Sequence, residues 1–334
     1  MRFKIFLVTI TFQLLIVILL GIKIHNGQKR VLGTSVNPIS KDSLLFPKDG
    51  KYKYFYEPYP NTKQDLDHQL ISDLGYSPNT KITISINSDG LNQLLNYPVE
   101  KPIGVFRIIT LGDSFTYGQN VNTEDNYPSQ LEKKLNERLS CKNINSFQVL
   151  NLGMEGYDIS YAVERYKLRG QKYNPDLVLW FILDTDLLRI DELQIPKAKH
   201  YDDQLKNSGE TEKLEKKGIF YQGWGLALNE IIKELGGEDK VLDLQKQYFS
   251  EFNKYYNGPL LIFNFPSSTV YEDVLNNFKN SRKNTFLYDQ LIDTYNNPLY
   301  HLKDYHPSPS GHALIAEDLY NYLTKNNIIP CEKP

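Results

Sequence analysis

The sequence predicts an α/β domain of three layers, in which a mainly parallel sheet lies between two layers of helices. Three observations support this fold. From residue 106 onward, short apolar runs alternate with helical stretches, an order typical of parallel sheets covered on both faces. The run at 177–182 is apolar at every position, as expected of a central parallel strand. The 334-residue chain is 40% hydrophobic and 23% charged, which is an ordinary globular mixture.

The elements follow in order along the chain. A half-buried strand is expected at 81–87, where isoleucine alternates with polar residues before a Ser-Asp-Gly turn. The strands of the parallel sheet are expected at 107–111, 147–152, 177–182, 260–265 and 285–288. Helices are expected at 126–139, 160–169 and 311–324. A charged insertion at about 189–247 interrupts this pattern.

The N-terminus predicts a membrane anchor. Residues 5–22 contain no charged side chain and follow Arg2 and Lys4. As a helix this stretch would reach about 27 Å at ~1.5 Å per residue, close to the thickness of the bilayer core. A cleaved signal peptide is the alternative, but no small-residue cleavage site follows the apolar run.

The chain is therefore expected to comprise three parts. These are a single-helix signal-anchor at 1–25, a tether and Tyr/Pro-rich extension at 26–80, and the α/β domain at 81–328. Because long domains are translocated largely regardless of nearby charge, we expect the α/β domain to be extracytoplasmic.

Charge and cysteine content limit the possible partners. A formal net charge of -2 gives no reason for attraction to nucleic acid. Cys141 and Cys331 lack metal-ligand spacing, and we expect neither a metal nor an organic cofactor. The two cysteines form one disulfide if the domain is exported, or remain two free thiols.

The first motif that carries chemistry is Gly112-Asp113-Ser114, directly after the strand at 107–111. Ligands collect at the C-terminal ends of parallel strands, and Gly112 leaves room for a substrate to approach. A serine hydroxyl is a poor nucleophile at neutral pH, so a base must reach Ser114.

The second motif supplies that base just before the last helix. It contains Asp304 and His306, two residues apart and followed by Pro307 and Pro309. Asp304 can accept a hydrogen bond from one ring nitrogen of His306, which leaves the other nitrogen free to take a proton from Ser114.

Together, Gly112-Asp113-Ser114 and the segment from Asp304 to His312 resemble the SGNH (GDSL-like) serine hydrolases, including membrane-anchored bacterial members. The resemblance covers about residues 82–325 and implies an SGNH or flavodoxin-like sandwich. It also implies a catalytic set of Ser114, Asp304 and His306.

Two middle blocks extend the resemblance to an oxyanion hole. The segment 151–157 is similar to the second block of the family, which implies that Gly156 donates its N–H to the oxyanion beside the N–H of Ser114. The segment 183–186 falls where the family has G-x-N-D. Thr185 thus stands in place of an asparagine whose amide helps to hold the oxyanion, and loss of one such donor can cost roughly 2.7–4 kcal/mol.

The implied function is a serine esterase that hydrolyses O-acyl esters, either of small molecules or of extracellular or cell-envelope glycans. An O-acyltransferase that passes the acyl group to a sugar is one alternative. The other is a catalytically weak glycan-binding protein on the same fold, because Thr185 and Leu183 depart from the third block.

Overall fold

The computed structural model describes residues 44–48, 50–211, 222–265, 269–292, 294 and 297–333. The predicted anchor at 1–25 lies outside these residues. Within the described ranges, no helix combines the length and the apolar character needed to cross a membrane.

A five-stranded sheet forms the centre of the molecule, and every neighbouring pair in it is parallel. Its spatial order is β6-β5-β7-β8-β9. The strands are β5 (Val105–Leu111), β6 (Ser146–Asn151), β7 (Leu177–Phe181), β8 (Leu260–Phe263) and β9 (Thr285–Tyr288). The central strand β7 is buried at all positions, because both of its faces are covered. The predicted α/β fold with a parallel sheet is confirmed.

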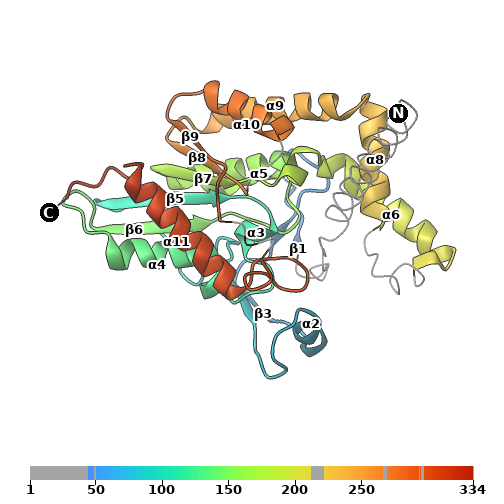
Figure 1. Ribbon diagram of the computed structural model, residues 1–334, viewed down its shortest axis with the longest axis horizontal. Helices are drawn as coiled ribbons and strands as arrows, with labels where there is room; N and C mark the ends of the chain where they lie inside the picture. The colour runs from blue at the N-terminus through green and yellow to red at the C-terminus, as the bar shows by residue number, and fades with distance from the viewer. Residues whose placement is uncertain are drawn as a thin grey trace, which may run out of the picture.

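Helices cover both faces of this sheet (Figure 1). One face packs against α5 (Ile159–Arg165), α9 (Glu238–Tyr255) and α10 (Thr269–Asn280). The other packs against α4 (Tyr127–Arg138) and α11 (Pro309–Lys325). Successive strand residues point to opposite faces, so Ile108 joins the second core and Ile109 the first. A π-helical turn, Tyr166–Gly170, and a 3-10 turn, Gln171–Tyr173, continue α5.

The described part of the N-terminal extension lies against this core. Strand β1 (Leu44–Leu45) pairs antiparallel with β2 (Glu57–Pro58), and β3 (Thr62–Asp65) pairs with β4 (Thr83–Ile86). The short helix α2 (His68–Asp73) lies between β3 and β4. The strand expected at 81–87 is thus present as β4, outside the main sheet.

The charged insertion is helical where it is described. Helix α6 (Asp191–Asn207) packs on α8 (Gln222–Leu235), and both lie at one end of the molecule (Figure 1). The last residues of the expected insertion, 238–247, already belong to α9 and help to cover the sheet.

A disulfide joins Cys141 and Cys331, whose Cα atoms are 5.1 Å apart. Of the two alternatives that the sequence left open, the structure therefore has the paired cysteines. The bond ties the loop before β6 to the segment that follows α11.

Candidate active site

Ser114 begins the one-turn helix α3 (Ser114–Tyr117), at the C-terminal end of β5. The preceding Gly112 has φ +147°, and a Cβ atom there would lie 2.9 Å from the carbonyl oxygen of Phe181. Only glycine fits this bend without displacing β7. Asp113 caps the helix, because its carboxylate accepts a hydrogen bond from the N–H of Phe115 at 2.9 Å.

The structure brings Ser114, His306 and Asp304 together across 192 residues of chain. The Oγ of Ser114 lies 2.8 Å from Nε2 of His306, and Nδ1 of His306 lies 2.9 Å from Oδ2 of Asp304. His306 is only 2% exposed and Ser114 only 8%, so little water competes for these contacts. The geometry is that of a nucleophile, a base and a carboxylate that orients the base.

The loop that carries the base has an unusual backbone. Tyr305, between Asp304 and His306, has φ +70°, a left-handed backbone conformation that residues other than glycine rarely adopt. This bend lets the Asp304 carboxylate meet both the ring and the backbone of His306, whose N–H donates to Oδ1 at 3.2 Å. Asn120, itself at φ +65°, donates from Nδ2 to the Asp304 Oδ2 at 2.8 Å. Nothing in the sequence singled out Asn120, because an isolated Asn carries no spacing signal.

The segment between β6 and α5 lies against α3. A Cβ atom at Gly153 would be 2.6 Å from the Cβ of Thr116, so glycine is required for this close approach. The N–H of Met154 donates to the carbonyl of Gly112 at 3.2 Å. Gly156, the predicted oxyanion donor, follows on the same segment with φ +74°.

Thr185 lies in the 3-10 helix η5 (Asp184–Leu187), just after β7, and is half-buried. The carboxylate of Asp186 caps this turn by accepting from the N–H of Leu183 at 2.9 Å. The position after a central strand is the one expected for an oxyanion residue, and the role of Thr185 stays a prediction.

A partly buried arginine, Arg189, lies between η5 and the Gly156 segment. Arg189 donates to the carbonyl oxygen of Gly156, and its guanidinium lies 2.8 Å from Asp191 and 3.8 Å from Asp186. Burial alone would lower the pKa of Arg189, but these carboxylates outweigh burial and raise it. The sequence did not single out Arg189, because it begins the charged insertion, where one arginine among many charged residues carries no signal.

The carboxyl groups around Arg189 titrate far from their usual range. Burial raises the pKa of Asp113 to about 6 and that of Asp191 to about 7. Burial and the nearby Asp113 together raise the pKa of Asp186 well above its ordinary value. In the described ranges, no group of three or more His, Cys, Asp or Glu side chains is placed to hold a metal ion.

No family model matches the sequence, and no curated protein matches it either. Solved structures do match. TesA is 12% identical over 66% of this chain and 98% of its own, with a TM-score of 0.42. The psychrotrophic esterase EstA from Pseudoalteromonas sp. is 16% identical over 66% of this chain and 98% of its own, with a TM-score of 0.38. The Clostridium thermocellum family 3 carbohydrate esterase is 14% identical over 68% and 99%, also at 0.38.

Two of these three solved structures are esterases, and their similarity to this chain is one of fold.

Proposed function

We propose that this protein is a serine esterase that hydrolyses O-acyl esters through an acyl-enzyme on Ser114. The observation that carries the proposal is the continuous chain of contacts from Ser114 Oγ to His306 Nε2 at 2.8 Å and from His306 Nδ1 to Asp304 at 2.9 Å. A structural hydrogen bond would need neither the buried ring nor the carboxylate behind it.

In the proposed acylation step, Ser114 Oγ attacks the ester carbonyl carbon while its proton passes to Nε2 of His306. The tetrahedral intermediate collapses when the C–O bond to the alcohol breaks, and the leaving oxygen takes the proton from His306. Asp304 fixes the ring and stabilises its positive charge, and Asn120 holds the carboxylate in place. In the second half, water attacks the acyl-enzyme with His306 as base, which releases the acid and restores Ser114.

The negative charge on the carbonyl oxygen needs hydrogen-bond donors. We assign this role to the N–H groups of Ser114 and Gly156, with the hydroxyl of Thr185 as a third donor. Both Ser114 and Gly156 lie on segments held in close contact by the Gly153–Thr116 approach. Donors fixed before the reaction stabilise the transition state without reorganising, which makes them effective.

The proposed setting is the outside of the cytoplasmic membrane, with residues 1–25 as the anchor and ester-bearing glycans or small molecules as substrates. The disulfide between Cys141 and Cys331 supports export, because such bonds persist in oxidising compartments.

The test compares the purified full-length chain with its Ser114→Ala variant in the hydrolysis of p-nitrophenyl acetate. Ser208→Ala, at an exposed serine of the insertion, is the matched control. We expect Ser114→Ala to reduce kcat to background and to abolish labelling by a fluorophosphonate, while Ser208→Ala behaves like wild type. Equal turnover in wild type and Ser114→Ala, with Ser114 unlabelled, would contradict the esterase proposal and favour a binding protein on this fold. Acylation of an added sugar in place of free acetate would identify a transferase.

A further inference from the structure

The N-terminal extension reaches the peptide group that contains the proposed oxyanion donor. The hydroxyl of Tyr56 donates to the carbonyl oxygen of Glu155 at 2.6 Å. This carbonyl and the N–H of Gly156 belong to one trans peptide unit, in which C=O and N–H point in opposite directions. A bond that fixes the carbonyl therefore also fixes the direction of the Gly156 N–H.

The fit between Tyr56 and Gly156 is close. A Cβ atom at Gly156 would lie 2.7 Å from the Tyr56 hydroxyl oxygen, closer than real Cβ contacts come. Gly156 also has φ +74°, where a side chain would be strained. The glycine thus permits both the backbone bend and the approach of the tyrosine.

Two further side chains hold the same short segment. Arg189 donates to the carbonyl of Gly156, which fixes the next peptide unit. Gln119, just past α3, donates from Nε2 to the carboxylate of Glu155 at 2.8 Å. The peptide between Glu155 and Gly156 is therefore restrained by contacts with the extension, the insertion and the end of α3.

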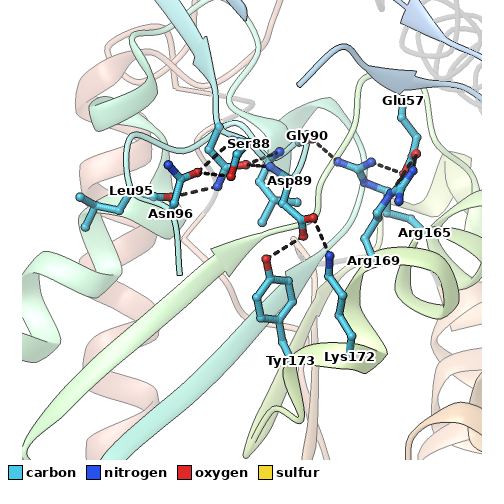
Figure 2. A network of polar contacts seen from close by, with 12 residues as sticks. Glu57, Ser88, Asp89, Gly90, Leu95, Asn96, Arg165, Arg169, Lys172 and Tyr173 are labelled. Carbon is cyan, nitrogen blue, oxygen red and sulfur yellow. Dashed lines mark hydrogen bonds and ion pairs between the residues drawn. The ribbon is translucent and has the colours of Figure 1, made fainter. Parts of the chain in front are cut away.

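Tyr56 is itself held firmly in place. Its neighbour Glu57, 2% exposed, forms ion pairs with Arg165 and with Arg169, which donates to the carboxylate through Nε at 3.0 Å (Figure 2). The hydroxyl of Tyr157 donates to the Tyr56 carbonyl, and the two rings pack edge to face at 5.5 Å. Burial and the nearby carboxylates Asp191 and Glu155 raise the pKa of Tyr56, so its hydroxyl stays protonated as a donor.

We propose that Tyr56 is a positioning residue of the active site, which aims the N–H of Gly156 at the oxyanion by holding the carbonyl of Glu155. The inference rests on the proposed esterase function and gives the extension a part in it. Without the hydroxyl, the peptide can rotate, and the oxyanion loses part of the stabilisation that the N–H of Gly156 gives.

The experiment uses Tyr56→Phe in the full-length chain, because phenylalanine keeps the ring and removes only the hydroxyl. Tyr52→Phe is the matched control, since Tyr52 comes from the same segment and packs its ring on Tyr161, while the donor to the Glu155 carbonyl is Tyr56. Melting temperatures are measured first, and rates are then compared at a temperature at which all variants are folded.

We expect Tyr56→Phe to lower kcat for p-nitrophenyl acetate about 10- to 100-fold, a fraction of the effect of deleting an oxyanion donor, and to leave KM within about twofold. The rate of fluorophosphonate labelling should fall by a similar factor, because the phosphoryl oxygen occupies the same site. Tyr52→Phe should stay within about twofold of wild type on both measures.

A Tyr56→Phe kcat within twofold of wild type, or a loss that Tyr52→Phe shares, would overturn the positioning role. That result differs from failure of the esterase proposal itself, in which wild type would be no more active than Ser114→Ala.

Discussion

The two sides of Ser114 are built in different ways. On the base side, Asp304, Tyr305 and His306 are consecutive, and a single left-handed residue brings the carboxylate and the imidazole together. On the oxyanion side, the Gly156 segment is held by Tyr56 and Arg189, which are about a hundred and about thirty residues away in the chain. The proposed base is thus assembled mainly by local backbone geometry, and the proposed oxyanion donor by long-range side-chain contacts.

The difference teaches which parts of such a site depend on the rest of the molecule. We expect changes in the insertion to leave the Asp304–His306 contact intact, because that contact is contained in three residues and its further support comes from Asn120, in the loop after α3. The oxyanion side depends on how the extension and the insertion dock onto the core, so distant changes reach it.

Asp304→Asn should lower kcat about 10³- to 10⁴-fold, because an amide cannot orient the imidazole in the tautomer that accepts from serine. The amide nitrogen introduced at position 304 would also face Nδ2 of Asn120, which in wild type donates to Asp304, so two donors would oppose each other. The measurement is kcat with p-nitrophenyl acetate, and the control is Asp203→Asn on the exposed face of α6. A loss smaller than tenfold would show that the base side does not depend on this carboxylate.

Thr185→Asn should raise kcat about tenfold, because a longer side-chain amide reaches the oxyanion better than a hydroxyl does. Thr185→Val, which keeps the shape and removes the hydroxyl, should lower kcat by a similar factor. KM is measured in both variants and should change little. If both variants turn over like wild type, Thr185 does not reach the oxyanion.

His312→Asn should change how stability depends on pH. His312 is fully buried, its Nδ1 accepts from the N–H of Tyr127 at 3.2 Å, and burial lowers its pKa to about 3. An unfolded chain takes up a proton near pH 6.5 while the folded chain does not, so wild type loses stability as the pH falls from about 6.5 towards 3.

An asparagine side chain can accept the same hydrogen bond from the N–H of Tyr127, and it does not titrate. Between pH 7 and pH 5, wild type should therefore lose about 2 kcal/mol of unfolding free energy that His312→Asn keeps. Urea unfolding at the two pH values measures this difference. Identical pH dependence in both proteins would show that folding does not lower the pKa of His312.

The base side and the sheet could be predicted from the sequence because their signals are local. Strands β5 to β9 were expected within a few residues of their observed bounds, since a buried parallel strand is a short continuous apolar run. The residue types and the spacing of Asp304 and His306 predicted their contact. Gly156 could be named only through the family resemblance.

The residues that hold the oxyanion segment could not be predicted. Tyr56 lies in a stretch rich in tyrosine and proline without a clean period, and Arg189 in one rich in charge. Each acts through one hydrogen bond to a backbone carbonyl, and because every residue has such a carbonyl, the acceptor gives no signal in the sequence. Such contacts become visible only when the chain is folded.

The disulfide has a consequence for the making of the protein. Cys141 is synthesised 190 residues before Cys331, so its thiol stays unpaired with Cys331 while four of the five strands of the sheet and α11 are still being added. The disulfide then closes a covalent loop of residues 141–331, which contains His306 but not Ser114. In the chain-entropy view, a ring of this size removes about 5 kcal/mol of freedom from the unfolded chain. Protein produced in a reducing cytosol should therefore lack the disulfide and unfold more readily. Protein produced in an oxidising compartment should contain the disulfide.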